Sequence, residues 1–272
     1  GLTPVLAGRD AGRVQALAAE LGFEGRAFAL TDTRALHDAL RDMACVLHMA
    51  GPFSRTSAPM LEACLEMGVH YVDITGEIQV FEQCAKADSR AKACGIMVLP
   101  GAGFDVVPSD CLAKHTAGRI DGAMGLSLAI AARGNASRGT AKTAMESVGA
   151  RPCVRRGGRL AHLTAPVYRD FDYGSGPRRS VTVSWGDVST AYYSTGIPDI
   201  DVYFPSSKML EWSYGLGPLQ KRFWQSPIGQ WLIAYGIDKR AAGPSDEERA
   251  AANSVLIAEV EDGRRNKVVS KL

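Results

Sequence analysis

The sequence predicts an α/β protein, in which a doubly wound parallel sheet is followed by a second domain of mixed α+β structure. Over the first hundred residues, short apolar segments alternate with amphipathic helical segments, as in a parallel sheet covered by helices on both faces. After about Pro108 the β-rich segments lose these regular crossovers. Hydrophobic residues make up 46% of the 272 residues and charged residues 22%, a composition that excludes a disordered or fibrous chain.

The expected strands of the first domain are short apolar segments at residues 4–7, 26–30, 44–49, 70–74 and 96–99. The helices between them carry apolar residues at spacings of three and four. In the first helix these residues are Val14, Leu17, Ala18 and Leu21. Asp10 is the expected N-cap of this helix, and Gly22 its end. One long helix is expected over residues 79–94.

We divide the chain into a first domain of residues 1–108 and a second domain of residues 109–272. The expected strands of the second domain lie at residues 126–131, 180–185, 201–204, 255–260 and 267–270. Glu261-Asp262-Gly263 separates the last two of them and predicts a hairpin turn.

Charge and cysteine content exclude several classes of function. Lys and Arg number 31 against 29 Asp and Glu, a net charge of +2, which is too balanced for a protein whose main partner is nucleic acid. The six cysteines form no C-x-x-C pair and no metal-ligand spacing, so we expect no metal site, no disulfide framework and a cytoplasmic location. No uninterrupted apolar run is long enough to span a membrane.

Ligands of doubly wound sheets bind where the strands end, so the loops after the strands hold the candidate cofactor site. Gly8 and Arg9 follow the first strand, and a guanidinium there suits the 2′-phosphate of NADP; the alternative is a solvated surface arginine. Asp32 follows the second strand and either accepts from the adenine amino group or caps a helix. Gly51-Pro52-Phe53 allows close approach of a cofactor or forms a plain turn.

Candidate catalytic residues follow the last two strands of the first domain. Tyr71 and Glu77 cluster after the fourth strand, and Asp105 follows the fifth. A partly desolvated carboxylate has a raised pKa and serves as a general acid or base, although each of these residues could instead hold its own turn. Gly101-Ala102-Gly103 has Val106 where a phosphate-binding loop needs its third glycine, which favours a tight turn between domains.

Together, these motifs resemble the saccharopine dehydrogenase-like oxidoreductases, with the trans-acting enoyl reductases among the nearest relatives. The resemblance is carried by residues 6–9, 50–53, 70–77, 99–112 and 137–140. It implies an NADP-binding Rossmann domain followed by a substrate and dimerisation domain, hence a homodimer. It also implies that Arg9 lies at the 2′-phosphate, Gly51-Pro52-Phe53 along the dinucleotide, and Thr75 and Gly76 with Glu77 near the nicotinamide.

The resemblance further implies an NAD(P)-dependent oxidoreductase that uses NADP to act on a small or lipid-like carbonyl, imine or enoyl substrate. The alternative is a non-catalytic relative that serves as an interaction or lipid-surface module. Family members begin one strand earlier, with the glycine-rich turn that holds the pyrophosphate. The first domain of this chain is therefore expected to lack that strand and turn, and the truncated chain is expected to bind cofactor weakly.

Two further segments draw attention. Ser137-Arg138-Gly139-Thr140 precedes a helical pattern and forms either an anion seat for substrate or an ordinary helix start. Residues 210–235 hold three of the four tryptophans, and an aromatic stripe is expected along one helical face. This stripe favours core packing or a dimer contact; the alternative is a peripheral contact with the inner face of the membrane.

Overall fold

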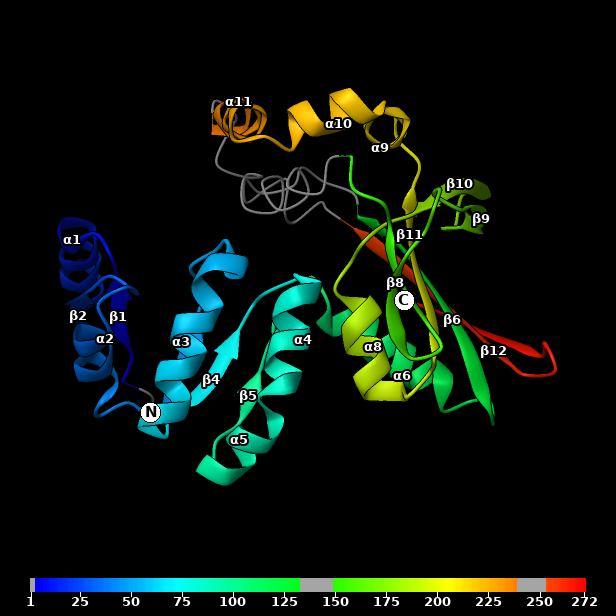
Figure 1. Cartoon of the computed structure of the whole chain (residues 1–272). Coiled ribbons are helices and arrows are strands. Elements are labelled where there is room, and N and C mark those ends of the chain that lie inside the picture. Colours follow the sequence, from blue (N-terminus) through cyan, green and yellow to red (C-terminus); the bar gives the residue numbers. More distant parts are fainter. Residues whose placement is uncertain (1–2, 133–148, 239–252) are drawn as a thin grey trace. The chain divides into compact units, whose positions relative to one another are not determined.

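The computed structural model describes residues 3–132, 149–238 and 253–272. The chain forms two compact units, Gly1–Phe104 and Asp105–Leu272 (Figure 1). The sequence placed this boundary at residue 108. The first unit carries parallel strands with helical crossovers and the second a mixed sheet with helices, so the predicted α/β fold is confirmed.

Strands and helices alternate through the first unit. In chain order they are β1 (Val5–Gly8), α1 (Ala11–Leu21), β2 (Glu24–Ala27), α2 (Thr33–Leu40), β3 (Cys45–His48), α3 (Phe53–Met67), β4 (His70–Asp73), α4 (Ile78–Lys86), α5 (Asp88–Cys94) and β5 (Val98–Leu99). All pairings are parallel: β1 pairs with β2, and β4 lies between β3 and β5. A buried core that includes Leu61, Cys64, Tyr71 and Val80 supports β4.

The strand pairing leaves one position open in the first unit. Within the described part of the chain, β1 has no neighbour besides β2, and β3 none besides β4. A dinucleotide-binding sheet has the strand order 3-2-1-4-5-6. The two pieces β2-β1 and β3-β4-β5 correspond to positions 3-2 and 4-5-6, so the central position 1 is the open one.

Three local predictions for the first unit need correction. The second strand ends at Ala27 rather than at residue 30, and the helix expected over residues 79–94 is divided into α4 and α5 at Ala87. Of the predicted apolar stripe of α1, Val14 and Ala18 are buried, whereas Leu17 and Leu21 are about half exposed. The sheet piece β1-β2 is only two strands wide and cannot cover the whole stripe.

The second unit is built on a mixed sheet of eight strands within the described ranges. They are β6 (Ala123–Ala132), β7 (Cys153–Arg156), β8 (Arg159–His162), β9 (Tyr168–Asp172), β10 (Pro177–Thr182), β11 (Asp199–Pro205), β12 (Ser254–Asp262) and β13 (Lys267–Lys271). The main order is β13-β12-β6-β11-β10-β9, with β7 beside β11 and β8 beside β7. The predicted hairpin after Glu261 is present between β12 and β13.

Two helices, α6 (Val107–Ala117) and α8 (Asp187–Thr195), pack together on the sheet of the second unit (Figure 1). Successive residues of a strand face opposite sides, and β11 shows this alternation. Its Ile200 and Val202 are fully buried, whereas Asp199 and Asp201 are partly exposed. One face of the sheet therefore packs against helices, and the other carries charged side chains.

After β11 the chain forms α9 (Lys208–Gly215), α10 (Pro218–Trp224) and α11 (Pro227–Asp238). The single helical face expected for the aromatic residues is interrupted, because α11 starts anew at Pro227. Among the described residues, no helix combines the length and apolar character that a membrane span requires.

Candidate functional site

The loop after β1 presents Arg9 at the carboxyl end of the strand. Arg9 is exposed, and no described residue forms an ion pair with it. Gly8 lies against the first turn of α1, where an added Cβ would come within 3.0 Å of Val14. Asp10 caps α1 by accepting from the backbone N–H of Arg13 at 3.1 Å. The loop thus combines a tight strand-to-helix turn with an available cation.

The loop after β2 ends in a helix cap. Asp32 Oδ1 accepts from the backbone N–H of Ala35 at 3.0 Å and caps α2. The sequence left two roles open for Asp32, a helix cap and a contact with the adenine, and the structure shows the helix cap. The adenine contact stays a prediction.

The carboxylate of Glu77, in the loop after β4, is hydrogen-bonded to the chain that follows β3. Gly51-Pro52 is a cis peptide bond, and Phe53 begins α3. The two carboxyl oxygens of Glu77 accept from the backbone N–H groups of Phe53 at 2.9 Å and Ser54 at 2.7 Å. Negative charge at a helix N-terminus is stabilising. Glu77 therefore caps α3 across space, and its predicted catalytic role stays a prediction.

Tyr71 and Asp73 form a buried pair at the end of β4, and neither side chain is exposed to solvent. The Tyr71 hydroxyl donates to Asp73 Oδ2 at 2.6 Å, while Oδ1 accepts from the N–H groups of Thr75 at 3.0 Å and Gly101 at 2.8 Å. Burial, with the nearby Asp73 carboxylate, raises the pKa of Tyr71 far above its ordinary value. Tyr71 thus acts as a hydrogen-bond donor in the core.

The Gly101-Ala102-Gly103 turn is held by the same carboxylate. Gly101 adopts a positive φ of 73°, and the Ala102 N–H donates to the Asp73 carbonyl at 2.7 Å. Gly103 leaves no free space for a side chain, because an added Cβ would approach Ile74 to 3.1 Å. The segment is a tight turn at the end of the first unit, as its missing third glycine indicated.

His48, which sequence reasoning did not select, lies next to the candidate loop after β3. It is 4% exposed at the carboxyl end of β3, and its Nε2 lies 3.0 Å from Thr56 Oγ1. The Thr56 hydroxyl donates to the Ala50 carbonyl, so Nε2 carries the hydrogen and donates to Thr56. Burial lowers the pKa of His48, which keeps the ring neutral. A histidine ending an apolar strand just before the Gly51 turn was the signal.

The second unit contains three carboxylates that burial perturbs. Asp187 begins α8, is fully buried, and neither of its carboxyl oxygens has a hydrogen-bond partner among the described residues. Burial raises its pKa to about 8, and the charges of Asp110 and Asp105 act in the same direction.

Asp105 and Asp110 are less enclosed. Burial raises the pKa of Asp105, and none of the described residues donates a hydrogen bond to its carboxyl group; its backbone carbonyl accepts from Trp185 Nε1 at 3.0 Å. Burial also raises the pKa of Asp110, although Ser194 Oγ donates to this carboxylate at 2.9 Å. The three predicted catalytic residues are Tyr71, Glu77 and Asp105. Of these, only Asp105 has a side-chain polar group without a hydrogen-bond partner among the described residues.

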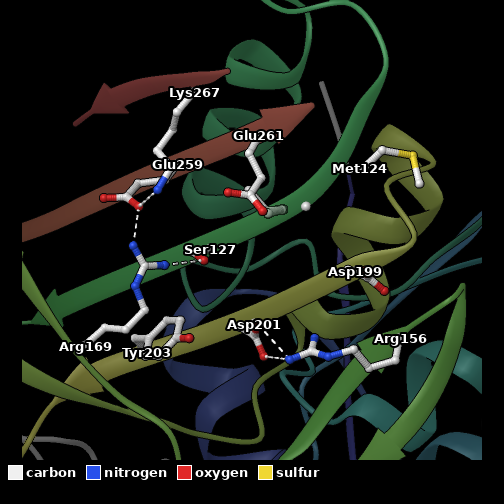
Figure 2. Close-up of a pocket in the computed structure, with 12 residues that line it drawn as sticks. Met124, Ser127, Arg156, Arg169, Asp199, Asp201, Tyr203, Glu259, Glu261 and Lys267 are labelled. Carbon is white, nitrogen blue, oxygen red and sulfur yellow. Dashed lines mark hydrogen bonds and ion pairs between the residues drawn. The ribbon is translucent and has the colours of Figure 1, made fainter. Parts of the chain in front are cut away.

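A cavity of about 450 Å³ lies on the charged face of the second sheet (Figure 2). Strand register places its residues in two rows across β11, β6 and β12. The first row consists of Asp199, Gly125 and Glu261, and the second of Asp201, Ser127 and Glu259. Small residues on β6 thus form a floor between carboxylates on both sides.

The cations of this cavity are already paired. Arg156 binds Asp201 at 2.7 Å. Arg169 binds Glu259 at 2.6 Å, and Lys267 lies 3.7 Å from the same carboxylate. Because each of these three cations already has an acidic partner within the sheet, we assign no ligand to the cavity.

Two other predictions concern the anion seat at residues 137–140 and the absence of a metal site. Ser137-Arg138-Gly139-Thr140 lies outside the described residues. Within the described ranges, no three His, Cys, Asp or Glu side chains come together in a way that could hold a metal ion.

Comparisons with known proteins agree with this geometry. The model of the saccharopine dehydrogenase NADP-binding domain matches residues 2–99. A Mycobacterium tuberculosis protein provisionally named a trans-acting enoyl reductase is 28% identical over 237 residues, which cover 77% of this chain and 55% of that protein. The saccharopine dehydrogenase-like oxidoreductase of Bos taurus is 28% identical over 96 residues, covering 35% of this chain and 22% of that protein.

A solved structure shares the fold. Saccharopine dehydrogenase (L-Glu forming) from Saccharomyces cerevisiae has a TM-score of 0.56 and 11% sequence identity, with 98% of this chain and 79% of that chain covered. At this identity the likeness shows the fold alone. The chain spans about half the length of the M. tuberculosis relative.

The parallel strands and the loops at their carboxyl ends define the class of dinucleotide-binding domains. More particularly, residues 2–99 match the family model of the saccharopine dehydrogenase NADP-binding domain. The resemblance that the motifs predicted is confirmed, and so is NADP as the cofactor of this domain.

Proposed function

We propose that this chain is the cofactor-binding part and the sheet domain of an oxidoreductase that transfers hydride between NADP(H) and a small or lipid-like carbonyl, imine or enoyl substrate. The observation that carries the proposal is Arg9, which stands exposed and without a described ion-pair partner at the end of β1 in a domain of an NADP-binding family. A planar guanidinium matches the oxygens of a 2′-phosphate.

The residues after the strands fit a dinucleotide. Gly51 leaves space, because an added Cβ would meet nothing closer than the Phe53 ring at 3.7 Å. Thr75 and Gly76 follow β4, where the nicotinamide end is proposed to lie. When bound, the nicotinamide supplies or accepts the hydride; the chain orients it and the substrate.

Asp105 is our proposed proton donor. Reduction of a carbonyl, imine or enoyl group by hydride requires one proton from an acid. The raised pKa of Asp105 favours its protonated form, and its carboxyl group has no described partner. Tyr71 and Glu77 are poorer candidates, because Tyr71 donates to Asp73 and Glu77 caps α3.

Three further parts of the proposal concern the whole protein. A cytoplasmic location and a homodimer are proposed on the resemblance alone. Tight cofactor binding is proposed to need a glycine-rich strand-to-helix turn at the open position between β1 and β3, since a helix N-terminus there would hold the pyrophosphate.

A titration of the full-length protein with NADPH and NADH, followed by fluorescence, tests the proposal. Arg9→Ala should weaken NADPH binding by about 1.5–3 kcal/mol, or about 10- to 150-fold, and leave NADH binding nearly unchanged. Arg41→Ala is the matched control, because Arg41 is exposed and pairs only locally with Asp38.

Equal losses for both cofactors in Arg9→Ala would contradict the 2′-phosphate assignment. If the full-length wild type bound neither cofactor, the non-catalytic alternative, a scaffold for interactions or lipid surfaces, would replace the oxidoreductase.

A further inference from the structure

The helices α9 to α11 expose an aromatic and apolar surface. From Trp212 onward, its most exposed large apolar side chains are Leu219 (83%), Ile228 (67%), Trp231 (62%), Tyr235 (51%), Phe223 (47%) and Trp212 (45%). The prediction that the stripe packs in the chain's own core is therefore wrong for Trp231 and Tyr235.

This surface, defined here as residues 212–237, is anchored at its start. The Tyr214 hydroxyl donates to the Thr182 carbonyl of β10 at 2.8 Å, and Ser213 Oγ accepts from the Gly149 N–H at 3.0 Å. Leu216 is 7% exposed. The exposed rings also order one another, since Trp231 and Tyr235 stack at 5.5 Å. The exposed aromatic groups thus belong to a helical segment whose first helix, α9, is attached to the sheet of the second unit.

Charge on the surface has one sign. From Trp212 to Ile237 the only charged residues are Lys221 and Arg222, while the acids Glu211 and Asp238 lie just outside. In a symmetric dimer the same patch meets itself, so a second copy would contribute two further cations and no acid from residues 212–237. An anionic partner is the complement.

We propose that residues 212–237 bind the surface of a bilayer containing anionic lipids. Tryptophan and tyrosine favour the membrane–water interface, where the ring is buried and the polar tip stays wet. Lys221 and Arg222 would reach the lipid phosphates. Among the described residues, no helix is long and apolar enough to cross a bilayer, and the contact that we propose is a peripheral one. This attachment goes beyond the proposed reaction and does not depend on it.

Co-sedimentation of the full-length protein with phosphatidylcholine vesicles, with and without phosphatidylserine, tests the proposal. The wild type should bind the phosphatidylserine vesicles more tightly and lose binding at high salt. Trp231→Ala should weaken binding at least about tenfold, and Lys221→Gln with Arg222→Gln about tenfold or more. The melting temperature should stay unchanged in Trp231→Ala, because the ring is exposed.

The matched control is Phe23→Ala, which removes a ring that is 39% exposed in the first unit and should leave vesicle binding unchanged. The proposal is overturned if the wild type binds neither vesicle. It is also overturned if Trp231→Ala dissociates a dimer while vesicle binding persists, because a second copy then covers the surface.

Discussion

In the unit that ends at Phe104, the Asp73 carboxylate accepts three hydrogen bonds, whereas in the unit that begins at Asp105, the Asp187 carboxyl group accepts none from the described residues. Both side chains are fully buried. Asp73 has donors placed around it by a strand, a loop and a glycine turn. Burial is the largest cause of the raised pKa of Asp187; the charges of Asp110 and Asp105 also raise this pKa, and the nearby Ser109 hydroxyl lowers it.

The difference separates two uses of an acidic residue. A buried carboxylate that is fully hydrogen-bonded fixes the local structure, whereas one without partners is held neutral by its environment. In the first unit, Asp10, Asp32 and Glu77 also accept from backbone N–H groups at helix starts. Carboxyl groups with raised pKa values, which often mark functional sites, instead cluster around Asp105, Asp110 and Asp187 in the second unit.

The largest effect is expected at Asp73. Asp73→Ala should lower the free energy of unfolding by about 3–5 kcal/mol, because it leaves the buried Tyr71 hydroxyl and two backbone N–H groups without an acceptor. Urea denaturation measures the loss.

Tyr71→Phe is the control for this change. It removes one donor and keeps the ring, so it should cost about 1–2 kcal/mol. A loss at Asp73 no larger than the loss at Tyr71 would show that the Gly101 turn does not depend on the carboxylate.

How far the sequence predicts this contrast depends on how many residues separate the two partners of each contact. Helix caps such as Asp10 and Asp32 are predictable, because cap and N–H lie three residues apart. The contact between Glu77 and Phe53 is not, because 24 residues separate them. Nor is the burial of Asp187, since it is set by the packing of α8 on α6 and the sheet.

The same limit explains the errors in the fold. Alternating patterns predicted the parallel strands, but the exposure of Leu17 and Leu21 depends on how wide a sheet lies beside α1. Apolar spacing likewise could not distinguish a buried aromatic stripe from the exposed surface of residues 212–237.

The second prediction concerns pH and Asp187. Its pKa is about 8 in the folded chain and about 3.9 when unfolded. Between these values the folded chain holds a proton that the unfolded chain has lost, so this group lowers stability as pH rises from about 4 to about 8. Asp187→Asn removes the titration. Its stability should match that of the wild type near pH 4 and exceed it increasingly toward pH 8, by up to about 1.4 kcal/mol per pH unit.

Denaturation of both proteins across this pH range provides the measurement. A constant difference between the two curves would mean that Asp187 does not titrate with a raised pKa. Asp187 and Asp73 would then differ only in the number of hydrogen bonds that their carboxyl groups accept.

A smaller effect is expected at Glu77. Glu77→Gln keeps one acceptor oxygen but removes the charge at the start of α3, so it should cost about 1–2 kcal/mol. Thermal denaturation gives the stability change. Glu66→Gln serves as a control within the same helix, because Glu66 is half exposed near the end of α3 and pairs with His37. Equal losses in the two variants would contradict a cap across space.

The smallest effect is expected at Asp32, where the two interpretations of the loop after β2 differ. Asp32→Ala removes the side-chain acceptor for the Ala35 N–H and should cost about 1 kcal/mol of stability. Asp38→Ala, in the same helix, removes only an exposed contact with Arg41 and should change stability by less than about 0.5 kcal/mol. NADPH titration of the full-length variants then isolates the adenine contact. If Asp32 only caps α2, both variants bind NADPH like the wild type; a loss of about fivefold or more in Asp32→Ala alone would place its second oxygen on the adenine amino group.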